Sequence, residues 1–490
     1  MIFLVLHRTN DGYIRLCTRF LVVALLILTY VPVFAAQTTF KPSLELSETY
    51  TDNVARSRNL SKEDYITEIN PGFALQTDGS RLNTNLGFTL QNRFYVKNSS
   101  RNARYYALEA DASAELIKDF AFLNLKASES QQEISSLGVL ARDNSNTADR
   151  ADISVWRINP HFKKRFGGKA EGSASYSYRE TRNGGLGVSS AKTEAVQVGL
   201  NSGPFFRRMT WSLDYSQETI ERSEARNNSK EFSEANADYR VYKKLGVLFL
   251  AGNKRSDLAT FKDGSYYALG IGIVPHSTLQ IGLLWGDRLD RASISWAPSR
   301  RSALNIVLQR EEIGLNTNRV LKGTLQLIGR RITWRARYSE DETSAEERLG
   351  DLQSGNSSSS ECSLSDGSFA RKRGQTYFGY KTVKSLVSVD LYKERREFEV
   401  TDFEPARNEK SRGGTVSWLW RFATRTTMLL SFHGSKDECF GTVKSRNTEI
   451  SFSRKMGRAM EGQIKAQKKS GNGLRNYDEN RFSVGVKWHF

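Results

Sequence analysis

The chain has 490 residues and a formal net charge of +18, and 38% of its residues are hydrophobic although it holds 26 Phe, 19 Tyr and 8 Trp. So many aromatic residues argue against a disordered chain, and the low hydrophobic fraction suits a protein with one face toward lipid and one toward water. The positive charge favours anionic partners, and three cysteines are too few for a disulfide scaffold.

The N-terminus has the three parts of a secretory signal peptide. Arg8, Arg15 and Arg19 precede the apolar run 20–28, and the small residues Ala35 and Ala36 follow it. A single membrane anchor is the alternative, but the run is shorter than the ~20 residues that a spanning helix needs. We therefore expect residues 1–36 to be cleaved on export, and we do not expect an exported chain to bind nucleic acid.

From about residue 40 to the end, apolar side chains recur at every second position. The side chains of a strand alternate between two faces, and about ten residues cross a bilayer when the strand is tilted. The pattern therefore predicts strands with one apolar and one polar face. The clearest segments are 82–90, 106–116, 209–215, 245–251, 279–285, 304–308, 332–338, 387–391, 414–420 and 450–452.

The connections between these segments alternate in length. If the first strand, at about 42–50, leaves the periplasm, the short connections are periplasmic and the long ones external, which is the rule for outer-membrane barrels. Short turns are expected at 78–80, 118–119, 165–168, 203–208, 243–244, 275–277, 297–301, 329–330, 383–384, 423–425 and 454–457. Long loops are expected at 51–63, 131–150, 180–191, 219–231, 255–264, 340–373, 398–411, 436–445 and 469–480.

The fold class predicted from these patterns is all-β, a large antiparallel transmembrane β-barrel of about 20–24 strands over residues 37–490. One or two soluble β-sandwiches are the alternative, because their strands alternate too. Sandwiches, however, give no reason for the alternating loop lengths. Since strand signals begin within a few residues of Ala36, we expect no plug domain.

The last strand supports the same interpretation. Residues 481–490 place apolar or aromatic side chains at every even position and end the sequence on an aromatic residue, which resembles the C-terminal signal of bacterial outer-membrane β-barrels. We expect this strand to pair with the first strand near Leu44 and Leu46, and to place Lys487 and His489 toward the lumen. The predicted signal residues are Phe482, Val484, Val486, Trp488 and Phe490.

Several segments resemble the outer-membrane β-barrel proteins associated with the PEP-CTERM/exosortase system, which are found near exopolysaccharide biosynthesis genes. The residues that carry the resemblance are 47–54 (SETYTDNV), 70–73 (NPGF), 158–160 (INP), 166–167, 202–206 (SGPFF), Trp211, 296–300 (WAPSR), 333–334 and 338–339. The resemblance implies a role in exporting, assembling or anchoring extracellular polysaccharide and its sorted proteins. It implies no catalytic residues.

Basic residues gather at the predicted short turns. They either reach to the membrane interface, as Lys and Arg commonly do, or form a cationic mouth for an anionic polymer or an acidic partner. Arg331, Arg335 and Arg337 fall on the face opposite Trp334 and are expected to line the lumen. The turn residues are Lys163, Lys164, Arg165, Arg207, Arg208, Lys243, Lys244, Arg300, Arg301, Arg330, Arg331, Arg454 and Lys455.

The longest loop, 340–373, is rich in Glu and Ser, and we expect it either to be a disordered polar segment or to fold inward over the pore. It contains Cys362, which could pair with Cys439 in the 436–445 loop if their Cα atoms come within ~7 Å. Five tryptophans toward strand ends predict an aromatic girdle, and sugar stacking in the lumen is the alternative. They are Trp285, Trp296, Trp334, Trp420 and Trp488.

Motifs of catalysis are missing from the sequence. His161, His276, His433 and His489 lack metal-ligand spacing, and no GxSxG or HExxH motif occurs. We expect no enzyme activity, no metal and no cofactor. The expected function is a pore or scaffold for exopolysaccharide export; a sealed surface protein whose outer loops bind matrix or sorted proteins is the alternative. Expected partners are outer-membrane lipid, the barrel assembly machinery, anionic polysaccharide and periplasmic export proteins.

Overall fold

The computed structural model describes residues 37–59, 61–133, 150–184, 190–223, 227–258, 261–314, 319–344, 368–398, 408–438, 441–472 and 476–490. These residues form 24 β-strands and one 3₁₀ turn, η1 (Ser99–Arg101). No helix among them is long and apolar enough to cross a membrane. The expected signal peptide, residues 1–36, lies outside the described residues.

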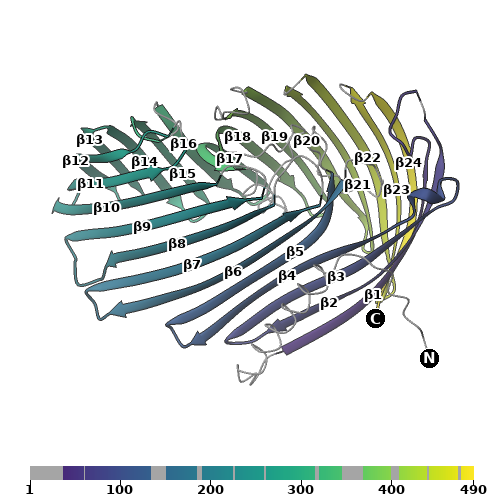
Figure 1. Ribbon diagram of the computed structural model, residues 1–490, viewed down its shortest axis with the longest axis horizontal. Helices are drawn as coiled ribbons and strands as arrows, with labels where there is room; N and C mark the ends of the chain where they lie inside the picture. Colours follow the sequence, from purple (N-terminus) through teal and green to yellow (C-terminus); the bar gives the residue numbers. More distant parts are fainter. Residues whose placement is uncertain are drawn as a thin grey trace.

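Apart from η1, the elements of the described chain are all strands, which follow one another along the sequence (Figure 1). The first twelve are β1 (Gln37–Thr51), β2 (Asp64–Asp78), β3 (Leu82–Tyr95), β4 (Ala103–Ile117), β5 (Ala121–Glu133), β6 (Arg150–Phe166), β7 (Ala170–Asn183), β8 (Ala191–Ser202), β9 (Met209–Arg222), β10 (Asn228–Tyr242), β11 (Leu245–Ser256) and β12 (Gly264–His276). The others are β13 (Leu279–Asp287), β14 (Leu289–Ser299), β15 (Ser302–Glu311), β16 (Arg319–Ile328), β17 (Ile332–Ser344), β18 (Ser368–Lys381), β19 (Ser385–Phe398), β20 (Asn408–Ala423), β21 (Thr426–Glu438), β22 (Thr442–Met456), β23 (Met460–Asn472) and β24 (Tyr477–His489).

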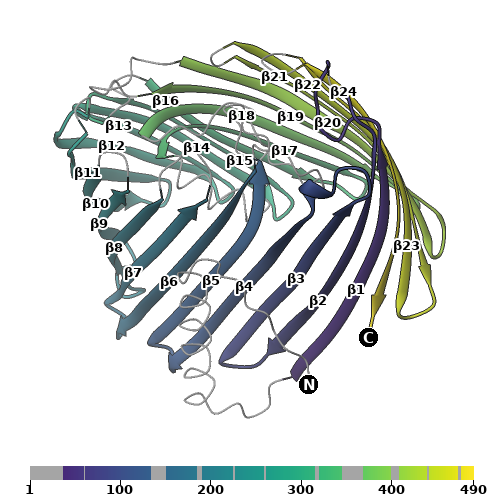
Figure 2. The ribbon, with the colours of Figure 1, turned by 45° about the vertical axis from the view of Figure 1, so that its right-hand side comes forward.

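Each strand pairs antiparallel with the next, and the sheet closes on itself. The closing ladder between β1 and β24 runs from Ser43 opposite His489 to Thr51 opposite Arg481. It pairs Leu44 with Trp488 and Leu46 with Val486, as predicted. Figure 2 shows β1 beside the β23–β24 hairpin. Closure leaves no sheet edge free to pair with another chain, so the predicted fold class is confirmed.

The alternating loop lengths are confirmed with two exceptions, one of which is the predicted long loop 436–445: it lies mostly within β21 and β22, which only three residues join. Every predicted short turn is short, and these turns share one end of the barrel, called here the short-turn end. The opposite, long-loop end holds the long connections, but β13 and β14 are joined there by Arg288 alone, with a φ of 60°. The strands span 9 to 17 residues, mostly more than the ten predicted, because many continue past the apolar segment toward the long-loop end.

Residues 151–164, where the alternation is ambiguous in the sequence, lie within the single strand β6. The ladder from β6 to β7 skips Asn159 and Pro160, because proline has no N–H to donate. The Asn159 side chain supplies a donor instead, and its Nδ2 lies 3.0 Å from the Tyr176 carbonyl oxygen. Pro160 therefore accounts for the irregular pairing of β6 with β7.

Inner and outer faces follow from the register. On most strands the outer face is apolar and exposed, as at Val247 and Phe249, and the inner face is polar. The wall at β11–β14 differs, because inward-facing Leu250, Ala268 and Leu284 form a small buried core there. Figure 1 shows the wall turning back on itself at this end. Glycine permits the tight turn, since a Cβ on Gly270 would lie 1.8 Å from a backbone oxygen of β13.

Candidate functional site: the lumen and its two mouths

The predicted C-terminal signal residues lie on the outer face of β24. Phe482 is 49% exposed and Val484 43%, and Val486 and Trp488 share their face. The backbone N–H of Phe490 donates to the Pro42 carbonyl at 3.0 Å and extends the closing ladder. By the same alternation, Lys487 and His489 belong to the inner face near the short-turn end.

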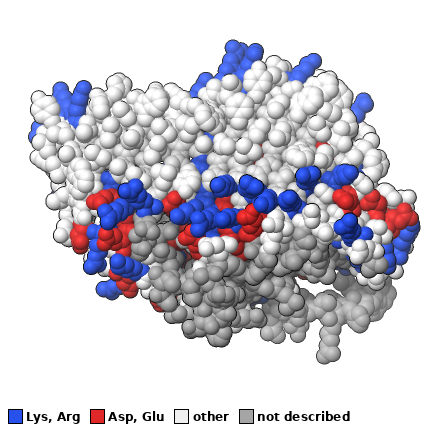
Figure 3. All heavy atoms as spheres, turned by 90° about the horizontal axis from the view of Figure 1, so that it is seen from above, with Lys and Arg blue, Asp and Glu red and all other residues white. Residues whose placement is uncertain are grey.

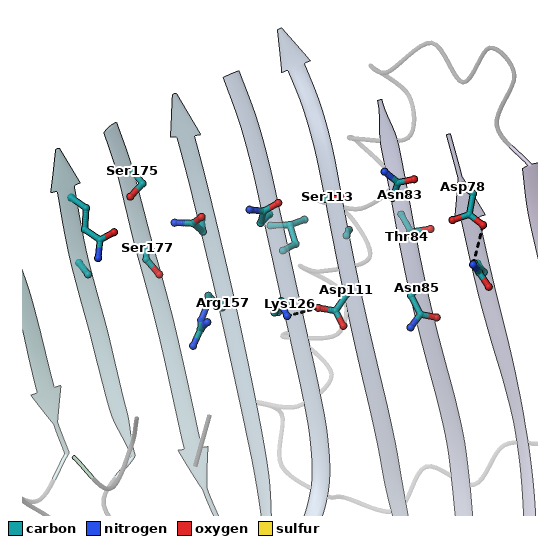
Figure 4. A pocket seen from close by; sticks show the side chains of 17 residues that line it. Asp78, Asn83, Thr84, Asn85, Asp111, Ser113, Lys126, Arg157, Ser175 and Ser177 are labelled. Carbon is teal, nitrogen blue, oxygen red and sulfur yellow. Dashed lines mark hydrogen bonds and ion pairs between the residues drawn. The ribbon is translucent and has the colours of Figure 1, made fainter. Parts of the chain in front are cut away.

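The inner wall of β2–β8 is built of amides, hydroxyls and a few charges (Figure 4). Side chains from neighbouring strands line a shallow recess of about 570 Å³, and Asn85, Ser113, Asn124, Ser175 and Ser177 are typical members. Asp111 and Lys126 form a cross-strand ion pair of 3.0 Å within it. Such a wall offers both donors and acceptors to hydroxyl-rich solutes.

Charged side chains of the two signs mostly balance along the lumen. Arg93 pairs with Glu68 at 3.0 Å, and Lys465 pairs with Glu449 at 3.2 Å. The predicted lumen arginines are an exception. Arg335 and Arg337 point inward from β17 and are exposed, opposite Gln326 and Thr324 on one side. The basic wall expected from the sequence is therefore one sector of the lumen, and on β9–β10 Asp214 lies opposite Glu234 on the same inner face.

The short-turn mouth is basic. All the basic residues predicted at turns lie in short connections or at the adjoining strand ends, and those of the five predicted turn pairs are exposed. Figure 3 shows Lys and Arg without Asp or Glu at the tips of one end, then an uncharged band, then a belt in which both signs occur. The exposed turn pairs are Arg207–Arg208, Lys243–Lys244, Arg300–Arg301, Arg330–Arg331 and Arg454–Lys455.

Near the long-loop end, the inner face carries ion pairs that are almost inaccessible to solvent. The side chain of Arg396 on β19 is 2% exposed, and it contacts Glu394 at 2.6 Å and Glu409 on β20 at 3.2 Å. Glu394 also accepts a hydrogen bond from Arg373 on β18 at 3.0 Å. Beside them, Arg371 makes a two-point contact with Asp341 at 2.8 and 3.0 Å.

A second buried cluster lies at the barrel seam. Glu479 of β24 contacts Arg56 at 3.0 Å and accepts a hydrogen bond from the Thr51 hydroxyl at 2.9 Å. Arg481, on the same inner face, lies 3.5 Å from Glu479. Neither cluster was predicted from the sequence, although the alternation that assigns Phe482 outward assigns Glu479 and Arg481 inward.

The predicted girdle tryptophans all project from the outer face, away from the lumen. Trp418 and Trp420 stack at 5.6 Å between ring centroids, and Phe422 continues the row toward the short-turn end. Trp334 donates from Nε1 to the Thr376 hydroxyl at 3.0 Å on the same outer face. Interfacial anchoring accounts for this placement better than sugar stacking in the lumen.

The cysteines and histidines singled out in the sequence have different outcomes in the structure. Cys362 and Cys439 lie outside the described residues, so their pairing stays a prediction. His161 stacks on Phe122 at 5.0 Å, and His433 shares a hydrogen bond with Thr415. Within the described ranges, no three His, Cys, Asp or Glu side chains gather as a metal site.

No family model and no curated protein matches this chain. Among solved structures, the siderophore receptor PiuA from Acinetobacter baumannii is 8% identical, covers 91% of this chain and 82% of its own, and superposes with a TM-score of 0.45. The FrpB iron transporter from Neisseria meningitidis is 9% identical, with 92% and 82% coverage and a TM-score of 0.44. OccAB3 from Acinetobacter baumannii is 9% identical, with 92% and 99% coverage and a TM-score of 0.36.

No substrate is carried over from these proteins at such low identity. The assignment rests on the molecule itself. A closed antiparallel barrel with an apolar outer band, aromatic residues at its border and a polar inner face is the architecture of outer-membrane proteins. This chain is an outer-membrane β-barrel.

Proposed function

We propose that this barrel is a passage for extracellular polysaccharide across the outer membrane, serving the export system that the PEP-CTERM/exosortase resemblance implies. The observation that carries the proposal is the inner wall of β2–β8, where amides and hydroxyls such as Asn85 and Ser113 outnumber charges. A hydroxyl-rich polymer can exchange hydrogen bonds with such a wall without meeting a large field of one sign.

The basic short-turn mouth supports an acidic polymer as the cargo. With the short turns in the periplasm, exposed pairs such as Arg207–Arg208 and Lys243–Lys244 face the side from which the polymer arrives. A ring of cations raises the local concentration of a polyanion and its rate of entry. Arg335 and Arg337 continue the positive field into one sector of the lumen.

A sealed surface protein is the second candidate, and one observation favours it. Glu409, Arg396 and Glu479 project inward near the long-loop end, yet each is at most 2% exposed on its side chain. These inner-face charges are therefore buried at this end of the barrel. In this case the barrel would display outer loops that bind matrix or sorted proteins.

Planar-bilayer recording separates the two candidates. The purified, refolded barrel should conduct if the lumen is open, and acidic polysaccharide added on the short-turn side should block the current. Neutral dextran of the same mass is the control and should block less. Absence of conductance would contradict the passage and favour the sealed barrel. Equal block by both polymers would contradict an acidic polymer as the cargo.

A further inference from the structure

The outer face of β19–β22 carries an uninterrupted row of cations. Across four strands the register places Lys393 opposite Arg412, Arg412 opposite Lys436 and Lys436 opposite Lys444. In a parallel row toward the long-loop end, Arg395 lies opposite Lys410. These six residues are called here the outer basic patch.

Only two acidic side chains accompany the patch on these four strands among the described residues. Glu397 pairs with Arg395 at 3.0 Å, and Glu438 pairs with Lys436. Lys410 lies opposite Glu438, whereas Lys393, Arg412 and Lys444 have no acidic residue opposite them in the register of these four strands. Like charges directly opposite each other destabilise a sheet, and a bound anion would offset that cost.

Several outward-facing cations elsewhere at the long-loop end lie beside acids. Lys192 lies opposite Glu221 and Arg255 opposite Glu231, while Arg310 contacts Glu312 at 3.4 Å. Arg319 does lie opposite Arg310, but β19–β22 differ from that pair in carrying a row of four cations across consecutive strands. Ordinary snorkelling of interfacial lysines does not explain why cations outnumber acids in this sector.

The patch borders the apolar band directly. On β20, Arg412 is followed on the same face by Gly414, then by Val416 and Trp418, both exposed. On β19, Lys393 is two residues from Leu391, which is 50% exposed. With the short turns in the periplasm, this border is the headgroup level of the outer leaflet.

An apolar groove continues the same cross-strand row into the band. The register runs from Gly323 to Tyr338, then to Gly374 and Lys393. Around the two glycines the outer face is hollowed by about 560 Å³, and the lining is almost wholly apolar, with Leu304, Ile306 and Leu321 along one side. Lys393 belongs both to the groove wall and to the patch.

We propose that the outer basic patch and this groove bind one phosphorylated glycolipid of the outer leaflet. Its phosphates would contact Arg412, Lys436 and Lys444, and an acyl chain would lie in the groove over Gly323 and Gly374. Arg and Lys are the side chains that best hold phosphate, and the adjoining groove selects an amphiphile over a soluble anion. This inference does not depend on whether the lumen conducts.

The test measures binding of fluorescent bis-phosphorylated lipid A to the refolded full chain in detergent micelles. A triple variant, Arg412→Gln, Lys436→Gln and Lys444→Gln, should bind about 100-fold more weakly, at roughly fivefold for each cation near an anionic surface. The matched control removes three cations that have acidic neighbours, by Lys192→Gln, Arg255→Gln and Arg310→Gln. It should change the affinity less than about threefold.

A groove variant tests the acyl-chain half of the site. A Cβ on Gly323 meets nothing closer than 3.8 Å, so Gly323→Leu fills the groove without a backbone clash. It should weaken lipid A binding while heat-modifiable gel migration shows a folded barrel. Equal losses in the patch and control variants, or unchanged binding by folded Gly323→Leu, would overturn the proposal, as would displacement of lipid A by inorganic phosphate at similar concentration.

Discussion

The buried cluster around Arg396 allows a stringent test of how the long-loop end of the lumen is stabilised. Arg396→Met keeps a similar volume but removes a charge whose side chain is 2% exposed and which contacts Glu394 at 2.6 Å and Glu409 at 3.2 Å. Glu394 retains Arg373, whereas the Glu409 contact is lost. Breaking a buried ion pair by removing one partner costs about 3–5 kcal/mol, so we expect a loss of that order in the free energy of unfolding.

The adjacent residue supplies the control. Arg395 lies on the outer face of the same strand, and its side chain is 50% exposed and 3.0 Å from Glu397. Arg395→Met should cost at most about 1 kcal/mol, because exposed ion pairs contribute little. Guanidinium unfolding of the barrel in phosphatidylcholine vesicles, followed by tryptophan fluorescence, measures both values.

A double variant tests the assigned cause. Adding Glu409→Gln to Arg396→Met removes the buried carboxylate that Arg396 contacts and should recover part of the loss, on the order of 1–2 kcal/mol. If Arg396→Met and Arg395→Met destabilised the barrel equally, or if the double variant were the less stable, the cluster would not be a coupled ion-pair network.

Three further outcomes are expected. Deleting Phe490, whose N–H extends the closing ladder at 3.0 Å, should lower the yield of heat-modifiable barrel, and an unchanged yield would remove its role in assembly. Gly270→Val should prevent folding because its Cβ would lie 1.8 Å from a backbone oxygen, while Gly87→Val, with 3.9 Å of clearance, should fold in the same gel assay. Arg335→Glu combined with Arg337→Glu should shift the reversal potential of a conducting barrel toward cations; an unmoved potential would show that this sector does not control permeation.

Much of the fold could be predicted because a barrel repeats two local signals. Alternation assigns each side chain to a face, and connection length assigns each turn to an end, so β24 could be paired with β1 from residues such as Trp488 and Leu44 alone. The corner at β11–β14 could not be predicted in this way. Alternation in 245–251 and 279–285 identifies the outer face, but it does not show that inward-facing Leu250 and Leu284 pack together across strands.

Candidate sites made of residues adjacent in the chain could be predicted from the sequence, whereas sites formed across several strands could not. Basic turns are visible because Arg207 and Arg208 are adjacent in the chain. The outer basic patch is not, since Lys393, Arg412 and Lys444 come from three strands and meet only through the register. A sequence shows how many charges a strand carries, but the register between adjacent strands decides which charges become neighbours.

This distinction changes how the net charge of +18 is interpreted. If the excess lay in the lumen, the barrel would act as a uniform anion filter, yet pairs such as Arg93–Glu68 and Lys465–Glu449 neutralise much of the inner wall. The surplus lies instead at the short turns and on the outer face of β19–β22. Under the two proposals, these sets of cations serve separate anionic partners, one entering from the short-turn mouth and one within the outer leaflet. Removing either set of cations should leave the other interaction intact, because the apolar band separates the two sets.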